Sequence, residues 1–163
     1  MLGALRDMNM DDLDRNLGFL LHDVARLMRR RFEQNARALG LTRSQCQVLA
    51  HLARNEGIQQ GSLAELLEIE PITLTRILDR LEEAGLVGRL LHRRDRRVRL
   101  LRLTKAAHPL IDDIFAIGAV TRGEALDGVA EHDRDRLFDV LSSMKSNLLG
   151  RLATAGERKA SHG

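Results

Sequence analysis

Apolar residues recur at steps of three and four near both ends of the chain, which is the pattern of long amphipathic helices. Similar spacing covers positions 137–152, and a third helical run covers 106–123. Helices of this length need a wide apolar partner, and a second copy of the chain is the simplest source of one. The N-terminal stripe consists of Leu13, Leu17, Leu20, Leu21, Val24, Leu27, Met28 and Phe32.

The middle of the chain predicts three shorter helices. Thr42-Arg43-Ser44-Gln45 and Ser62-Leu63-Ala64-Glu65 each match a capping box, in which a hydroxyl and a side chain three residues later satisfy the free backbone donors of a helix start. Pro71 suits the first turn of the third helix, which Gly85 would end. The last two helices are joined by about four residues, so they form a helix-turn-helix candidate.

A β-hairpin is predicted after Gly85. Two β-like runs, 86–92 and 97–103, flank the charged tip Arg93-Arg94-Asp95-Arg96, and Thr104 is predicted to cap the next helix. The expected fold is therefore mainly α with a small β-hairpin wing: a winged helix-turn-helix plus dimerisation helices.

Composition narrows the function classes. Hydrophobic residues make up 44% of the 163 residues, but only four residues are aromatic, all of them Phe. The core must therefore be aliphatic, and few side chains are present that could stack on RNA bases. The single cysteine, Cys46, indicates a reducing compartment. The acidic N-terminus does not resemble a signal peptide and no run approaches a membrane span, so we expect a cytoplasmic protein.

Charge is concentrated in one segment. The net charge is only +3, but positions 89–102 hold seven arginines and one acid and carry +6, which leaves −3 for the remainder. A cationic projection on a mildly acidic body points to a local nucleic-acid contact.

A helix-turn-helix followed by an arginine-rich hairpin suits duplex DNA. The second helix would enter the major groove, and the hairpin would reach phosphates or the minor groove. The outward residues of that helix are Thr73, Thr75, Arg76 and Arg80, of which Arg76 has the reach for guanine. The alternative interpretation is an ordinary solvated helix face.

These motifs resemble the MarR family of winged-helix transcription regulators, over roughly 13–152. The similarity is greatest to the SlyA branch, whose pattern after the wing resembles Thr104-Lys105-Ala106 and Pro109-Leu110-Ile111. It implies an obligate homodimer that binds a pseudo-palindromic operator in double-stranded DNA, with repression as the expected effect. The motifs are Leu41-Thr42, Ser62-Leu63-Ala64-Glu65-Leu66-Leu67, Thr75-Arg76-Ile77-Leu78-Asp79-Arg80-Leu81-Glu82-Glu83-Ala84-Gly85-Leu86-Val87, Asp95-Arg96-Arg97 and Leu103-Thr104.

The resemblance also implies a division of the chain. Residues 41–104 would be the DNA-binding winged helix, and 13–40 with 105–152 the helical dimerisation region. We expect an N-terminal extension, 1–12, and a tail, 153–163, to be flexible.

Site residues follow from the same resemblance. Arg76 stands at a base-contacting position, and Arg96 stands where the family's wing-tip arginine enters the minor groove. Asp95 and Arg97 match a pair that braces the wing as a salt bridge. Removing the Asp95 carboxylate would favour DNA on charge alone, so a loss of binding would show that geometry decides. Arg93, Arg94 and Arg99 are expected to contact phosphates or solvent.

Members of this family are often released from DNA by a small aromatic carboxylate or phenolic effector. Arg26 and Arg29 occupy ligand-facing positions of the SlyA branch, although a solvated helix face explains them equally well. The chain departs from that branch at Cys46, where an aromatic residue is usual, and at Ala50. Loss of that aromatic wall predicts a wider space, with a larger effector or none. We interpret Cys46 as a buried small hydrophobe rather than a redox switch.

No enzyme, metal site or cofactor is expected. Glu131-His132-Asp133 fits a helix start better than a metal site, and the chain contains none of the common hydrolase, zinc-protease, phosphate-loop or dinucleotide motifs. Two alternatives stay open: a winged-helix protein-interaction module without specific DNA binding, and a helical small-ligand carrier or small hydrolase.

Overall fold

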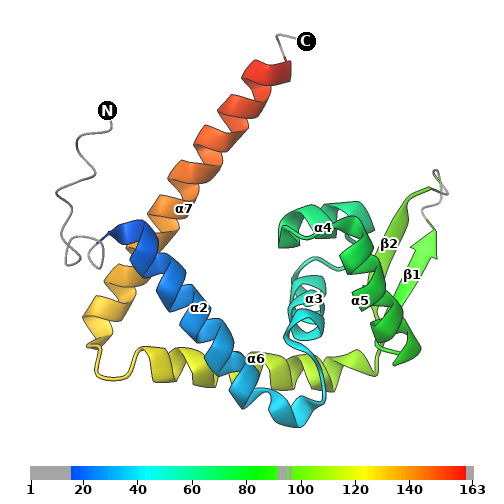
Figure 1. Cartoon of the computed structure of the whole chain (residues 1–163), viewed down its shortest axis with the longest axis horizontal. Coiled ribbons are helices and arrows are strands. Elements are labelled where there is room, and N and C mark those ends of the chain that lie inside the picture. Colours follow the sequence, from blue (N-terminus) through cyan, green and yellow to red (C-terminus); the bar gives the residue numbers. More distant parts are fainter. Residues whose placement is uncertain (1–15, 92–94, 96, 161–163) are drawn as a thin grey trace, which may run out of the picture. The chain divides into compact units, whose positions relative to one another are not determined.

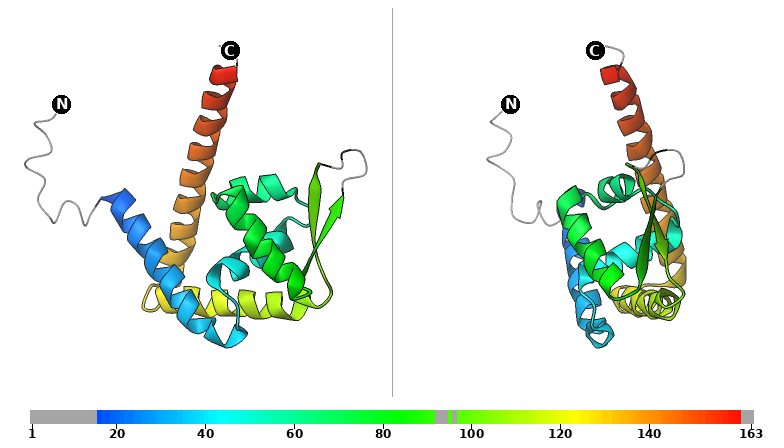
Figure 2. Two further views of the ribbon diagram at one scale, coloured as in Figure 1. Left: turned by 45° about the vertical axis from the view of Figure 1, so that its right-hand side comes forward. Right: turned by 90° about the vertical axis from the view of Figure 1, so that its right-hand side faces the viewer.

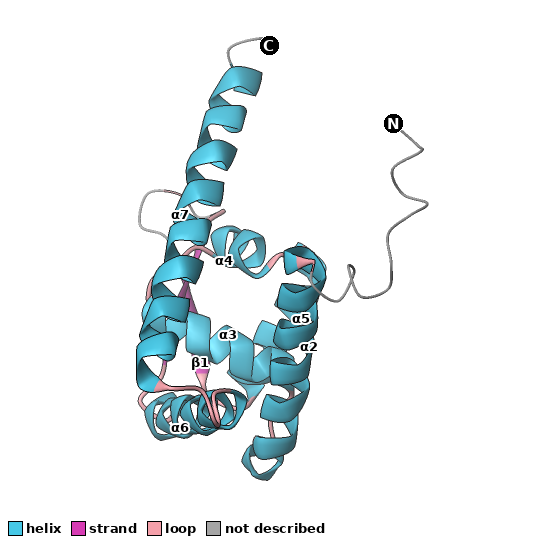
Figure 3. Cartoon of the chain, turned by 90° about the vertical axis from the view of Figure 1, so that its left-hand side faces the viewer, coloured by secondary structure: helices cyan, strands magenta, loops and turns pink. Residues whose placement is uncertain are grey.

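The computed structural model describes residues 16–91, 95 and 97–160 (Figure 1). Two compact units, Met1–Arg122 and Gly123–Gly163, divide the chain and are considered separately. Within the described residues, the fold is mainly helical with one two-stranded antiparallel hairpin, which confirms the predicted fold class (Figure 3). No helix of this described part is long and apolar enough to cross a bilayer.

The first unit contains the elements of a winged helix. In chain order these are α2 (Leu17–Asn35), a 3-10 turn η1 (Arg37–Leu39), α3 (Arg43–Arg54), α4 (Gln60–Leu67), α5 (Pro71–Glu83), β1 (Val87–Leu91), β2 (Arg99–Leu103) and most of α6 (Ala107–Ala125). The hairpin pairs Val87 with Leu103 and Leu91 with Arg99, so its strands are slightly shorter than predicted. Figure 2 shows α5 beside the hairpin.

The core of this unit is aliphatic, as the composition predicts. Its largest fully buried side chains are leucines from α3, α4, α5 and β2, and burial of each stabilises the fold by roughly 1.5–3 kcal/mol before side-chain entropy is counted. These leucines are Leu49, Leu52, Leu63, Leu74, Leu78, Leu81 and Leu101.

Two of the predicted helix boundaries are confirmed at atomic level. The Thr42 hydroxyl accepts from the backbone N–H of Gln45 at 3.2 Å, and the Gln45 side chain accepts from the backbone N–H of Thr42 at 2.8 Å. Pro71 lies in the first turn of α5, and Gly85 follows that helix with φ +70°, a conformation that glycine adopts without strain.

Two other predictions of caps are wrong. The helix α4 begins at Gln60, so Ser62 lies inside it and does not form a capping box with Glu65. The cause is pairing with the wing: Gln59 bridges Leu100, and the N–H of Leu101 donates to the carbonyl of Ile58, which directs the chain into the helix three residues early. The Thr104 hydroxyl donates to the Gly85 carbonyl at 2.6 Å instead of capping α6, which begins at Ala107.

The helix α2 has no buried residue and carries a row of exposed apolar side chains. Leu13, the first residue of the predicted stripe, lies outside the described residues. A hydrogen bond of 3.1 Å from the Asn35 amide to the Thr121 hydroxyl links the end of α2 to α6. The exposed apolar residues are Leu17, Phe19, Leu20, Leu21, Val24 and Leu27.

The second unit contains the end of α6 and the helix α7 (Glu131–Ala160). The Arg134 guanidinium donates to the carbonyls of Leu126 and Val129, at 2.9 and 2.7 Å, and so closes the turn before α7. The helix continues to Ala160, past Leu152, where the predicted apolar stripe ends. Flexibility of the tail stays a prediction.

Candidate nucleic-acid interface

The helix α5 has one buried and one exposed face. Leu74, Leu78 and Leu81 pack into the core, as the spacing predicts. On the outer side, Thr73, Arg76 and Arg80 are exposed and border a hollow of about 450 Å³ together with Thr42, Gln45 and Ile77. Three of the four DNA-contacting residues predicted on this helix therefore share one accessible surface.

Thr75, the fourth, is half-buried and already bonded. Its hydroxyl donates to the Pro71 carbonyl and accepts from the Gln60 side-chain amide, both at 3.0 Å. The structure thus places Thr75 at the contact between α4 and α5, with its one hydroxyl proton used inside α5.

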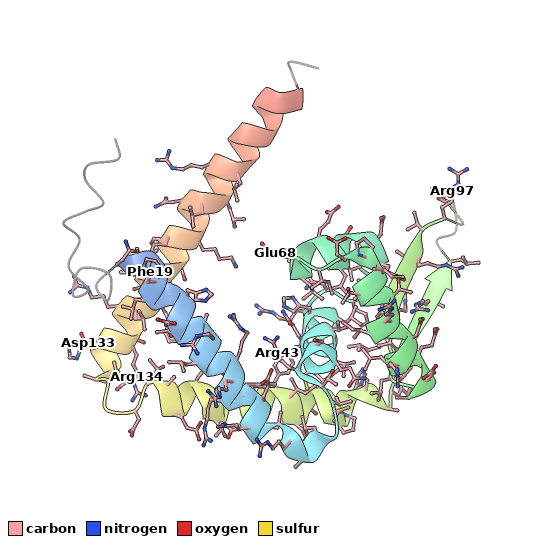
Figure 4. The ribbon with its side chains drawn as sticks, viewed as in Figure 1. Phe19, Arg43, Glu68, Arg97, Asp133 and Arg134 are labelled. Atoms are coloured by element: carbon pink, nitrogen blue, oxygen red, sulfur yellow. The ribbon has the colours of Figure 1, made fainter. Side chains whose placement is uncertain are left out.

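The described part of the wing presents arginines on and beside β2. Arg97, Arg99 and Arg102 are exposed, and Figure 4 shows Arg97 at the outer end of the hairpin. The Asp95 carboxylate accepts a hydrogen bond from the backbone N–H of Arg97 at 2.9 Å. This contact involves the Arg97 backbone and not its guanidinium, so the predicted salt bridge between the two side chains stays a prediction. Arg93, Arg94 and Arg96 lie outside the described residues.

A second hollow, of about 410 Å³, lies between the wing and the start of α4. Arg97 and Arg99 border it together with Gln59, Gln60 and Gly61. Free N–H groups at a helix start carry partial positive charge, which adds to the two guanidinium groups. The hollow therefore has the electrostatic character that suits a phosphate.

Arg89 does not belong to the cationic projection, although it lies in the arginine-rich segment. Its guanidinium turns back to α5 and pairs with Asp79 at 2.6 Å and Glu82 at 3.2 Å. Its charge is offset by two carboxylates, so the wing carries less free positive charge than the sequence count indicates.

A pocket of about 510 Å³ lies among α2, α3 and α6. Of the four predicted effector residues, Arg29, Cys46 and Ala50 line it. Arg26 does not, because its side chain pairs with Asp23 at 3.0 Å on the exposed surface of α2. The remaining lining residues are Met28, Phe32, Arg43, Gln47, Ile114, Phe115, Gly118, Thr121 and Arg122.

Position 46 supplies no aromatic ring to this pocket, but other positions do. Phe32 and Phe115 line it from α2 and α6, so two other segments supply the rings that position 46 does not. Arg43 and Arg122 add positive charge, and Arg43 also pairs with Glu33 of α2 at 2.8 Å. An apolar space bordered by guanidinium groups has the chemistry to hold a flat organic anion.

Sequence reasoning missed these four residues because they come from segments far apart in the chain. Phe32 and Phe115 are separated by more than eighty positions, and Arg43 looks like an ordinary first-turn residue of its helix. No local motif identified them; the only available signal was that phenylalanine is so scarce in this chain.

Cys46 and the cluster Glu131-His132-Asp133 are the two remaining candidate sites, and neither shows catalytic or metal-binding geometry. Burial raises the pKa of the Cys46 thiol, although a backbone hydrogen bond acts in the opposite direction. His132 contacts Asp133 at 3.3 Å in the first turn of α7. In the part of the chain that the structure describes, no group of three or more His, Cys, Asp or Glu residues could hold a metal ion.

Comparison with known proteins agrees with this geometry. The family model described as MarR family matches residues 41–98. The transcriptional regulator PA3341 is 38% identical, with a TM-score of 0.72, over 82% of this chain and 98% of its own. MarR from E. coli in its apo form is 26% identical with a TM-score of 0.73, over 78% and 95% of the two chains. The transcriptional regulator SlyA is 26% identical with a TM-score of 0.71, over 82% and 94%.

The family model covers the whole helix-turn-helix and the first part of the wing, and the PA3341 match extends the similarity over most of the chain. With α5 and the hairpin arranged as a winged helix, the chain belongs to the MarR family of transcription regulators.

Proposed function

We propose that the chain is a homodimeric repressor that binds a pseudo-palindromic operator and is released by a small aromatic or phenolic anion. The observation that carries the proposal is the exposed polar face of α5, with Thr73, Arg76 and Arg80, next to a wing that exposes Arg97 and Arg99. In this proposal, residues 41–104 bind DNA and residues 13–40 with 105–152 form the dimer.

Roles on the DNA differ between residues. Arg76 would read a base edge in the major groove, and Arg96 would enter the minor groove. Thr73, Arg80, Arg93, Arg94 and Arg99 would contact phosphates and set the register of the protein on the duplex, whereas Thr75, whose hydroxyl proton is used inside α5, would act through the contact between α4 and α5. The hydrogen bond from the backbone N–H of Arg97 to the Asp95 carboxylate supports bracing of the wing at its tip.

Dimerisation is supported by unpartnered apolar surface. The apolar row on α2 is exposed in the first unit, and α7 exposes a similar row in the second. Exposed apolar surface of this extent is typical of an interaction site, and a second copy of the chain is the simplest apolar partner for each helix.

An anionic effector is supported by the pocket among α2, α3 and α6. Arg29, Arg43 and Arg122 supply charge, and Phe32 and Phe115 supply stacking surfaces. Assignment to the SlyA branch stays a prediction, because SlyA and MarR from E. coli match this chain at the same identity of 26%.

Selection of bound sequences from a random duplex pool tests DNA recognition. We expect an enriched sequence with two-fold symmetry and half-sites about one helical turn apart, bound with an affinity that falls steeply with salt. Arg76→Ala should weaken operator binding by about 1–3 kcal/mol and relax the preference at one position of each half-site.

Arg37→Ala, on the exposed 3-10 turn away from α5 and the wing, is the matched control and should bind like the wild type. Recovery of no preferred duplex, together with a partner protein whose binding survives Arg76→Ala, would instead support the protein-interaction module.

Calorimetry with aromatic carboxylates such as salicylate tests the effector. A ligand that releases the operator should bind more weakly to Arg43→Ala and Arg29→Ala than to the wild type, because each change removes a charge from the pocket. Arg26→Ala is the control on the solvated face of α2, because Arg26 pairs with Asp23 and does not line the pocket.

A further inference from the structure

Arg89 forms the main polar link between the wing and α5. From strand β1, its Nη2 donates to the Asp79 carboxylate at 2.6 Å and to the backbone carbonyl of Thr75 at 3.2 Å, and its Nη1 donates to Glu82 at 3.2 Å. The three acceptors lie on successive turns of α5. One planar guanidinium therefore holds about two turns of this helix against one strand.

The link continues beyond α5. The Thr75 hydroxyl accepts from Gln60 in the first turn of α4, while the Thr75 carbonyl accepts from Arg89. A single residue of α5 thus joins α4 on one side and the wing on the other. Hydrophobic packing in the aliphatic core has no directional preference, whereas these hydrogen bonds do, so they add directional contacts between α4, α5 and the wing.

Arg89 is poorly placed to contact DNA itself. Only 19% of its side chain is exposed, against 49% for Asp79 and 44% for Glu82, and its charge is offset by both carboxylates. Its Nε is buried and has no hydrogen-bond partner among the described residues, so the two Nη groups carry the contact. Arg99 and Arg102, across the hairpin, remain exposed.

We propose that Arg89 is a positioning residue for DNA recognition, which holds the wing in a fixed register with α5 so that both reach the duplex together. The inference rests on the proposed DNA-binding function. Two contact elements that are already correctly placed bind better than two that must be ordered on binding, because the ordering cost is removed from the binding step.

For Asp79, charge and geometry predict opposite changes in operator affinity, so the direction of the change is a test. On charge alone, removing the Asp79 carboxylate from a DNA-facing helix should strengthen binding. If Asp79 instead acts by holding Arg89, then Asp79→Asn should weaken operator binding, in the same direction as loss of Arg89 itself.

The experiment uses the full chain, the selected operator duplex and a scrambled duplex of equal length, over a salt series. Arg89→Met, Asp79→Asn and the double variant are compared with Arg99→Ala, an exposed wing arginine. We expect Arg89→Met to bind the operator about tenfold more weakly, a size typical of a lost interaction of this kind, with little change on the scrambled duplex or in the salt slope.

The other variants separate geometry from charge. The double variant should bind no more weakly than either single variant, because both remove the same link. Arg99→Ala should weaken binding to both duplexes and reduce the salt slope by about 0.9 if it removes one phosphate contact. Arg89→Lys should recover part of the operator affinity, since an ammonium reaches one carboxylate but cannot reproduce the fork.

Hydrogen exchange of the free protein gives a readout without DNA. Amides of β1 and β2 should exchange faster in Arg89→Met, while those of α3 stay as in the wild type. If Arg89→Met does not fold, Arg89→Lys and Asp79→Asn carry the same comparison.

The inference is overturned if a folded Arg89→Met keeps the operator affinity of the wild type, or if its salt slope falls as that of a phosphate contact does. It is also overturned if Asp79→Asn binds more tightly. If the wild type prefers no duplex, the proposed function fails, and the exchange data then decide separately whether Arg89 couples the wing to α5.

Discussion

Cys46 shows how burial decides the chemistry of one residue. Its side chain is 1% exposed and packs with the leucines of α3, and burial raises the pKa of its thiol. A raised pKa keeps the thiolate, which is the reactive form, scarce at neutral pH.

We expect the native thiol to react about 100-fold more slowly with a thiol-reactive disulfide at pH 8 than the same protein does in urea. Oxidant treatment should leave operator binding unchanged, and Cys46→Ala should bind as the wild type does. Rapid labelling of the folded protein, or release from DNA by oxidant that Cys46→Ala abolishes, would contradict this and support a redox role.

Glu68 holds a backbone conformation that suits glycine better. It follows α4 with φ +53°, the only positive φ of a non-glycine residue in the described part of the chain, and the next N–H, of Ile69, donates to the Ala64 carbonyl. This left-handed turn between α4 and α5 costs an L-residue about 1 kcal/mol.

Glu68→Gly should therefore raise the free energy of unfolding by up to about 1 kcal/mol, measured by urea denaturation at one protein concentration. The control is Glu65→Gly in the interior of α4, which should lower it by a similar amount. A loss of stability in both variants would show that the turn is not strained by its side chain.

At the scale of elements, the start of a helix depends on what precedes it. Thr42 and Gln45 form the predicted reciprocal cap, whereas the equally good motif at Ser62 lies inside α4, since pairing of Gln59 with β2 places the helix start earlier. The two motifs thus make a matched pair for mutation.

Thr42→Ala should lower the free energy of unfolding by about 1 kcal/mol, because the backbone N–H of Gln45 loses the hydroxyl that accepts its hydrogen bond. Ser62→Ala should leave it unchanged or slightly raised, because alanine is the better residue inside a helix. Urea denaturation of both variants checks the pair, and a large loss in Ser62→Ala would mean that the hydroxyl has a role that the helix geometry does not show.

At the scale of the whole molecule, exposed apolar residues are the feature that a single chain leaves unexplained. They lie on α2 in one unit and on α7 in the other, where Leu137, Phe138, Val140, Leu148, Leu149 and Leu152 are exposed. The proposed homodimer would cover both rows.

Leu20→Glu and Leu148→Glu should each shift the protein from twice its chain mass of 18.3 kDa toward the monomer and weaken operator binding, because a buried unpaired charge is costly in an apolar interface. Sedimentation at micromolar concentration measures the mass. Ala53→Glu on the exposed side of α3 is the control and should stay at the wild-type mass. A wild type of single-chain mass would contradict the dimer.

Much of the fold could be predicted from local pattern. Apolar spacing indicated the helices, Thr42 and Pro71 marked two of their starts, Gly85 marked an end, and the scarcity of aromatic residues predicted the aliphatic core. These properties depend on residues within a few positions of one another, where spacing in the chain and spacing in the helix are directly related.

Contacts between distant segments could not be predicted in this way. Only the folded chain shows that Arg89 turns to Asp79, that Thr104 bonds Gly85, and that Phe32 and Phe115 meet in one pocket. Local sequence determined which residues are helical, apolar or charged. Tertiary packing decided which charges remain free for a partner, because an arginine's effective charge depends on the carboxylates that the fold brings beside it.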